Sequence, residues 1–227
     1  MPELSDFFPS DHSRASLLAA QELVAKMVID RDDFSALKCI AGVDQAFMDD
    51  QIISGIVVMK YDSFEVVERS NSLLDVCFPY IPTFLSFREG PAIVNAFKKL
   101  KNNPDILMVD GAGINHPRSA GIATHIGVAM DVPTIGITKK ILCGSGKEPQ
   151  QVGEAEPLIY EGRQTGWLLR SSKSSRAIIV APGHRISLDT SLSIVKQSIR
   201  GHKLPEPVRL AHEYVNDLKK GNKMMMK

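Results

Sequence analysis

The sequence is poor in the features that mark several classes of protein. Its 227 residues include only three cysteines, Cys39, Cys77 and Cys143, which are odd in number and widely spaced. This pattern argues against a disulfide framework or a cysteine metal site, and it fits a reducing compartment. The N-terminus has no basic region followed by an apolar stretch, and no apolar run reaches the roughly 18 residues that span a membrane. We therefore expect a cytoplasmic protein with no membrane partner.

An excess of charge of one sign is also missing. Lysine and arginine number 27 against 26 acidic residues, which leaves a net charge of +1. A chain without an overall positive coat must hold a polyanion through a local patch or a bound metal. The length suits one domain, because domains usually hold roughly 100 to 200 residues. We expect a single domain over residues 1–227, with a frayed tail at about 221–227 and the monomer as the default state.

Hydrophobic periodicity gives the order of the expected elements. Apolar residues at helical spacing predict a helix over residues 16–29, and a second striped helix is expected to begin near Pro205. Between them the patterns predict extended runs at 38–47, 52–61 and 64–71, a helix opened by Pro91, a strand at 106–109, a helix at 119–130 and a strand at 133–139. Residues 144–166 read as a loop or a β-excursion, to which the sequence assigns no role.

This order predicts an α/β fold. The first three extended runs are joined by short polar turns, so they should pair as an antiparallel meander. The alternating helices and strands that follow should add parallel strands, which gives a mixed sheet flanked by helices. The arrangement is that of a ribonuclease-H-like domain, in which the first and fourth strands lie side by side.

Three carboxylates occupy the ends of the expected elements. Asp44 follows a strand-like stretch, Asp110 ends the apolar strand at 106–109, and Glu89 sits just ahead of the helix that Pro91 would open. Taken singly, each has a structural explanation, since Asp is common in strand-end turns and acids favour helix N-termini. Taken together at one sheet edge, they predict a site for Mg²⁺, with Mn²⁺ as a substitute, because hard cations prefer oxygen ligands.

A proline-flanked turn is the second candidate functional feature. The sequence Pro79-Tyr80-Ile81-Pro82 fixes its own backbone and removes two hydrogen-bond donors, so it should project as a stiff turn. A rigid aromatic and aliphatic tip can enter a stack of bases when a single base is extruded. A proline-rich corner packed on the core is the alternative.

In these and other motifs, the sequence resembles the endonuclease V family, which is directed against deoxyinosine. The similarity lies in ordered blocks over most of the chain. These are Gly42-Val43-Asp44, Pro79-Tyr80-Ile81-Pro82, Leu85-Ser86-Phe87-Arg88-Glu89-Gly90-Pro91, Asp110-Gly111-Ala112-Gly113, His116-Pro117-Arg118, Pro133-Thr134-Ile135-Gly136-Ile137-Thr138-Lys139, Gly183-His184-Arg185-Ile186-Ser187 and Leu204-Pro205-Glu206-Pro207-Val208-Arg209-Leu210-Ala211-His212.

The resemblance implies a Mg²⁺-dependent DNA repair endonuclease of ribonuclease-H-like fold. It would recognise hypoxanthine, the product of adenine deamination, and cut the second phosphodiester bond on its 3′ side. By motif, the metal ligands would be Asp44, Asp110 and Glu89, with Glu89 alternatively orienting the water. His212 would act near the attacking water or the metal, and Lys139 would stabilise phosphate charge. The wedge would be Pro79, Tyr80, Ile81 and Pro82, and the base pocket would be lined by Leu85, Gly111, Gly113 and His116.

The residues themselves add expectations about the histidines and about the base pocket. His212 lies beside the apolar stripe of the last helix and should face the body of the protein, not open solvent. His125, His184 and His202 are expected to be structural. The amides at Gly111 and Gly113 could read the O6 and N7 acceptors of hypoxanthine, because glycine lets the backbone approach a ligand closely.

Two alternatives remain open at the level of sequence. The same chemistry could act mainly on inosine-containing RNA, which a pocket that reads the 2′-hydroxyl would favour. A non-catalytic nucleic-acid-binding module with the same fold is the other alternative. The intact acids Asp44, Glu89 and Asp110 argue against it.

Overall fold

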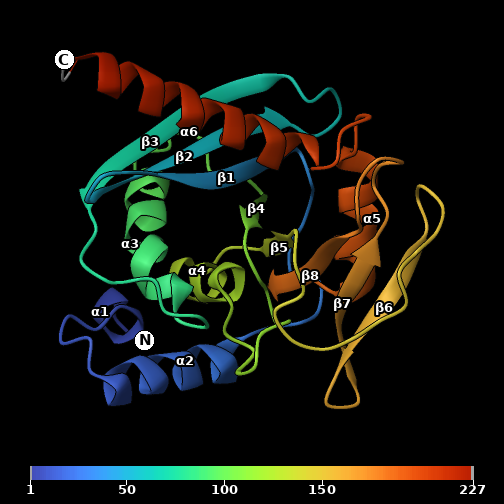
Figure 1. Ribbon diagram of the computed structural model, residues 1–227, viewed down its shortest axis with the longest axis horizontal. Coiled ribbons are helices and arrows are strands. Elements are labelled where there is room, and N and C mark those ends of the chain that lie inside the picture. The colour runs from blue at the N-terminus through green and yellow to red at the C-terminus, as the bar shows by residue number, and fades with distance from the viewer. Residues whose placement is uncertain (1, 226–227) are drawn as a thin grey trace.

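The structure, a computed structural model, describes residues 2–225 and contains one sheet of eight strands in the order β3-β2-β1-β4-β5-β8-β7-β6 (Figure 1). The first three strands, β1 (Cys39–Met48), β2 (Gln51–Lys60) and β3 (Val66–Asp75), form an antiparallel meander. The other strands are β4 (Ile106–Asp110), β5 (Thr134–Thr138), β6 (Ala155–Tyr160), β7 (Arg163–Leu169) and β8 (Ile178–His184).

The central strands pair as the sequence predicts. β4 lies beside β1 and runs parallel to it, and β5 runs parallel to β4. The mixed sheet of a ribonuclease-H-like domain is therefore confirmed. Beyond β5 the sheet continues with β8, β7 and β6, all antiparallel to their neighbours. The β6–β7 hairpin accounts for much of residues 144–166, so this segment is a β-excursion at the sheet's far edge.

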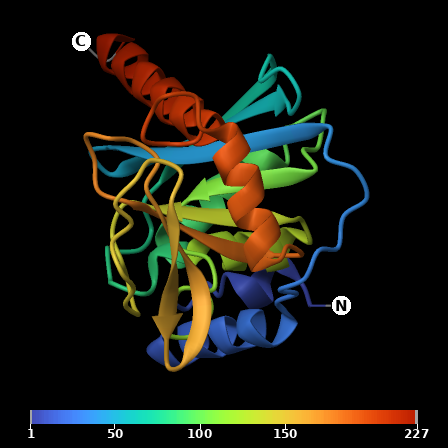
Figure 2. The same cartoon turned by 90° about the vertical axis from the view of Figure 1, so that its right-hand side faces the viewer.

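Helices cover both faces of the sheet. They are α1 (Leu4–Phe7), α2 (Arg14–Met27), α3 (Leu85–Phe97), α4 (Ile122–Met130), α5 (Leu188–Ser198) and α6 (Glu206–Met225). α3 and α4 lie on one face, whereas α6 crosses the other over β1 and β2 and α5 packs beside it (Figures 1 and 2). Alternation along the strands builds the two cores, since Ile40 contributes to the α6 side and Ala41 to the α3 side.

The start of α3 differs from the expectation. The helix begins at Leu85, and Pro91 lies inside it and does not open it. An interior proline costs about 3 kcal/mol, because it removes one helical hydrogen bond. Pro91 is exposed, while Ile93 and Ala96 on the opposite side of the helix are buried, so packing outweighs this cost. Glu89 is therefore held within a packed helix.

The C-terminal segment also differs from the expectation. α6 continues to Met225, so 221–225, expected to be a frayed tail, is helical, and Met226 and Lys227 lie outside the described residues. Lysine and methionine are good helix formers, and the buried residues Val208, Ala211 and Val215 anchor the helix on the sheet. Within residues 2–225, no helix combines the length and apolar character needed to cross a membrane.

Candidate active site

Strand register places two aspartates next to each other. Val43 of β1 is paired with Val109 of the parallel strand β4, so the following residues, Asp44 and Asp110, emerge at the same place. Asp44 lies within β1 and not after it, but it is one residue beyond the last pair with β4. It is 7% exposed. Burial raises the pKa of Asp44, and the neighbouring charge of Asp110 raises this pKa further.

A third acid reaches the same place from α3. Glu89 is 9% exposed. Burial raises the pKa of Glu89 to about 8, and the negative charges of Asp44 and Asp110 contribute to the rise, against a smaller opposing effect of Arg88. Neighbouring charges shift one another's pKa values, and the effect is stronger in a partly buried site than in water. The structure thus brings together the three carboxylates that the sequence singled out.

Two basic side chains contact these acids. The Lys139 Nζ atom, just after β5, is 2.8 Å from Asp110 Oδ2. The His212 Nδ1 atom, from α6, is 2.6 Å from Asp44 Oδ2. Because the Asp44 carboxylate accepts this hydrogen bond, Nδ1 of His212 is the donor. Nε2 is then the acceptor nitrogen of the ring. The His212 side chain faces the sheet as expected, but 51% of it is exposed, because the site opens to solvent there.

Two glycines let α6 come close enough for His212 to reach Asp44. A Cβ atom on Gly42 would lie 2.0 Å from the Pro207 carbonyl oxygen and 2.6 Å from the Val208 nitrogen. On the neighbouring strand, a Cβ on Gly55 would lie 2.6 Å from Val215 Cγ1. Gly55 is paired with Asp44 across the strands. The glycines therefore set the distance between the helix and the acids.

The donor set suits a hard divalent cation. Among residues 2–225, no group of three histidine, cysteine, aspartate or glutamate side chains is arranged to bind a metal ion. One oxygen of Asp110 accepts a hydrogen bond from Lys139. The ligand chemistry nevertheless fits, because all three acids offer carboxylate oxygens. Burial raises the pKa of Glu89, the negative charges of Asp44 and Asp110 add to the rise, and a bound cation would offset those charges.

A cavity of about 500 Å³ opens beside Asp110. This is within the roughly 300–1,000 Å³ range of small-ligand sites. The predicted residues on its wall are Tyr80, Ile81, Pro82, Leu85, Asp110, Gly111, His116 and Lys139. Tyr80 is 69% exposed, so the turn projects as expected. Pro79 and Gly113 do not line the cavity.

Two exposed apolar residues are among the lining residues that the sequence analysis missed. Ile141 and Leu142 stand on the cavity wall with exposed side chains. The available signal was a pair of apolar residues directly after Lys139 and Lys140, in a segment with no regular structure. They add apolar surface to the cavity wall.

The two glycine amides are not free to read a base, which corrects the sequence interpretation. The Gly111 amide donates to the Ile137 carbonyl oxygen at 2.8 Å, and the Gly113 amide donates to Asn115 Oδ1 at 2.8 Å. A Cβ on Gly113 would lie 2.1 Å from the Pro182 carbonyl oxygen. Gly113 therefore serves the contact between this turn and β8, which explains a glycine there without a ligand.

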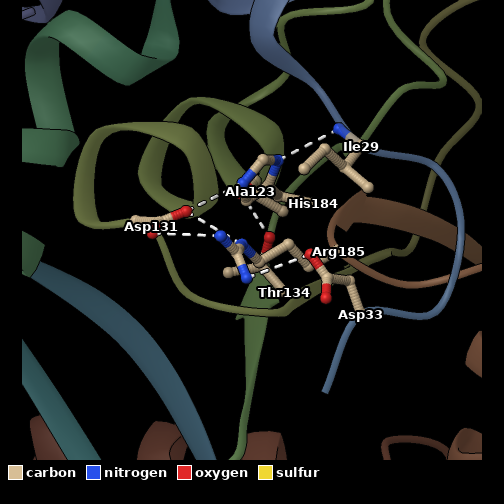
Figure 3. Close-up of polar contacts among 7 residues, drawn as sticks. All are labelled: Ile29, Asp33, Ala123, Asp131, Thr134, His184 and Arg185. Carbon is tan, nitrogen blue, oxygen red and sulfur yellow. Dashed lines mark hydrogen bonds and ion pairs between the residues drawn. The ribbon is translucent and has the colours of Figure 1, made fainter. Parts of the chain in front are cut away.

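The remaining buried histidines have structural contacts. Figure 3 shows His184 beside Asp131 and Arg185, close to Thr134 at the start of β5. His184 Nδ1 accepts from the Ile29 amide at 3.2 Å, and Arg185 pairs with Asp131 at 2.8 Å. This network is at the opposite end of β5 from Lys139. On α4, the fully buried His125 contacts the Phe7 carbonyl oxygen through Nε2 at 2.8 Å.

Comparison with known proteins identifies the family. A model of the Endonuclease V family matches residues 21–213. Endonuclease V from Dictyoglomus turgidum is 45% identical over 195 residues, which cover 86% of each chain. The solved Endonuclease V structure from Bacillus subtilis superposes with a TM-score of 0.89 at 30% identity, over 96% of this chain and 98% of that one.

A more distant structure has the same fold. Ciona intestinalis Endonuclease V, in complex with a 23mer DNA containing an inosine followed by a ribo-adenosine, has a TM-score of 0.81 at 23% identity, over 93% of this chain and 99% of that one. The family match over residues 21–213 and the identity to the Dictyoglomus protein carry the assignment. This chain therefore belongs to the Endonuclease V family and is a nuclease, a hydrolase that acts on phosphodiester bonds.

Proposed function

We propose that this chain is a Mg²⁺-dependent DNA repair endonuclease that recognises deoxyinosine and cuts the second phosphodiester bond on its 3′ side. The observation that supports this most is the position of the 500 Å³ cavity, which shares Asp110 and Lys139 with the cluster of acids. An extruded base in the cavity would leave its own strand passing over the carboxylates. The Ciona relative with an inosine-containing DNA supports the choice of base.

The acids and bases of the site have separate parts in this proposal. Asp44, Glu89 and Asp110 would hold Mg²⁺, which when bound acidifies a water and offsets charge on the phosphate. His212 is fixed by Asp44 through Nδ1, so its Nε2 can accept a proton from the attacking water. Lys139 can move from Asp110 to a phosphate oxygen, since its side chain is partly exposed.

Recognition would depend on the backbone of the turn after β4. Hypoxanthine presents a carbonyl at O6 where adenine has an amino group, so a donor there selects hypoxanthine. The Gly111 and Gly113 amides are occupied. The Ala112 amide between them has no hydrogen-bond partner within the described chain, and Ala112 lines the cavity. We assign the O6 donor to Ala112.

A nicking assay tests the proposal directly. Labelled DNA duplexes with one inosine, or with adenine in its place, are incubated with Mg²⁺ or with a chelator and separated on a denaturing gel. A Mg²⁺-dependent product ending one nucleotide 3′ of inosine is expected only from the inosine duplex. Asp110→Asn is the control variant and should fold, as judged by circular dichroism, without cutting.

The alternatives predict other products. A matching inosine-containing RNA that is cut faster than the DNA would replace the proposed substrate with RNA. Tight binding of inosine strands with no product in Mg²⁺ or Mn²⁺ would indicate a binding module. A fully active Asp110→Asn protein would contradict the assignment of the acids.

A further inference from the structure

The residue that follows the projecting turn has an unusual backbone conformation. Thr83 has a φ of +69°. This region is rarely occupied by β-branched residues, because the Cβ atom and its branches crowd the backbone. Such a conformation persists only where surrounding contacts hold it in place. Thr83 directly follows residues 79–82, which we call the wedge segment.

Three side chains from elsewhere in the chain converge on Thr83. Its carbonyl oxygen is 2.7 Å from Gln21 Nε2, 3.0 Å from His116 Nε2 and 3.2 Å from Arg118 Nη2. Its hydroxyl oxygen accepts from the same Arg118 nitrogen at 2.7 Å. We call Gln21, Thr83, His116 and Arg118 the Thr83 brace.

The members of the brace also hold one another. Arg118 Nε donates to Gln21 Oε1 at 2.6 Å, so the Gln21 amide is used at both ends. Gln21 is fully buried on α2. The Arg118 amide donates to His116 Nδ1 at 3.1 Å, so His116 Nε2 carries the proton and donates to Thr83. Both ring nitrogens of His116 are engaged, although the ring lines the cavity.

The wedge segment is held at its other end as well. Arg88 Nη1 donates to the Phe78 carbonyl oxygen at 2.6 Å, and its guanidinium lies 4.6 Å from the centre of the Phe47 ring. Arg118 lies 4.9 Å from the centre of the Phe84 ring. Each end is therefore fixed by an arginine that stacks on an aromatic ring. Tyr80 and Ile81, between these ends, remain exposed.

We propose that the Thr83 brace fixes the shape of the wedge segment before DNA binds, and that Gln21 and Arg118 are positioning residues for base extrusion. This inference rests on the proposed function. A segment that must enter a base stack loses less conformational entropy on binding if it is already rigid. In this arrangement His116 positions the wedge and does not read the base.

Gln21→Glu is the variant that isolates the contact to Thr83. Glutamate keeps the oxygen that accepts from Arg118, but it replaces the donor to the Thr83 carbonyl with a second oxygen. Val24→Ala is the matched control. Val24 is also fully buried on α2, but it packs against Phe7, Ala120 and Val128 and not against the wedge segment. If Gln21→Glu does not fold, Arg118→Lys takes its place, since lysine lacks the fork that reaches both partners.

The first test needs no nuclease activity. Chymotrypsin cleaves after aromatic residues, and Tyr80 is exposed in the wedge segment. We expect native-state cleavage after Tyr80 to be about tenfold faster in Gln21→Glu than in wild type, because a buried hydrogen bond is replaced by repulsion. Val24→Ala should stay near the wild-type rate. Equal cleavage of wild type and Gln21→Glu would overturn the brace.

The second test compares inosine in a duplex with inosine in a single strand. An unpaired base needs no wedge, so Gln21→Glu should lower kcat/KM about tenfold on the duplex and leave it near wild type on the single strand. A variant that is merely unstable would lose both rates together, and that result would refute a positioning role. If wild type cuts neither the duplex nor the single strand, the proposed function is wrong. The rate of chymotrypsin cleavage after Tyr80 would still show whether the Thr83 brace holds the wedge segment.

Discussion

Replacing Glu89 with glutamine should stabilise the metal-free protein at neutral pH and reduce its response to Mg²⁺. Burial, with the charges of Asp44 and Asp110, raises the pKa of Glu89 from its ordinary 4.5 to about 8. Between these values the folded state keeps a proton that the unfolded state releases. The folding stability of the wild type therefore falls as the pH rises through this window. Glutamine does not titrate, so the variant should lack this loss.

The size of the effect follows from the window. From pH 5 to pH 7, at about 1.4 kcal/mol for each pH unit, the wild type should lose about 3 kcal/mol relative to Glu89→Gln. A cation held by the site favours the ionised carboxylate, so saturating Mg²⁺ should remove most of this loss. The variant should gain less from Mg²⁺, because it lacks one charged ligand.

Urea unfolding followed by circular dichroism can measure both differences. Wild type and Glu89→Gln are unfolded at pH 5 and pH 7, each with chelator and with Mg²⁺. The same dependence on pH for the two proteins in chelator would refute the burial of a protonated Glu89. A wild-type dependence that Mg²⁺ leaves unchanged would show that the cation does not bind beside this residue.

Three further predictions test separate parts of the structure. Gly42→Ala should lower the nicking rate more than Gly55→Ala. The new methyl group at position 42 would meet the backbone of α6 and displace His212, whereas at position 55 it would meet side chains, which can move. Equal nicking rates of the two variants would contradict this. Tyr80→Ala should change the free energy of unfolding by less than about 0.5 kcal/mol, since the Tyr80 side chain is exposed. The same variant should nick duplex DNA more slowly. An unchanged nicking rate would contradict the role of residues 79–82 as a wedge. Burial lowers the pKa of His125 from 6.5 to about 4. As the pH falls from 6.5 to 4, the free energy of unfolding of wild type, measured in urea, should therefore fall by about 3 kcal/mol more than that of His125→Gln. The same dependence on pH for both proteins would contradict this.

The acid cluster could be predicted because it depends on features that the sequence displays. Buried strands appear as apolar runs, and the order of strands limits the topologies that a chain can adopt. Once the first and fourth strands are taken as parallel neighbours, Asp44 and Asp110 must meet. The exact positions could not be predicted in the same way. Asp44 lies inside β1 because β1 continues to pair with β2 beyond the end of β4.

Glu89 shows where local rules fail. Pro91 is a strong signal for the start of a helix, and it placed Glu89 outside the helix. The helix begins at Leu85, and its first turns are anchored by the buried Phe87, which packs against Leu17 and Phe78. Whether packing outweighs the cost of an interior proline depends on partners distant in the chain. No pattern within residues 85–97 reveals those partners.

The reading of the base is the part of the site that sequence reveals least, and the reason is hydrogen-bond accounting. Gly111, Gly113 and His116 all belong to motifs that mark a ligand site, and all three could offer donors. In the structure, however, partners within the protein already occupy these groups, including the carbonyl of Thr83, 33 residues before His116. A buried donor can bind a ligand only if the fold leaves it unsatisfied. Motifs therefore locate the cavity, whereas the specificity that we propose depends on groups such as the Ala112 amide, which has no hydrogen-bond partner among the described residues.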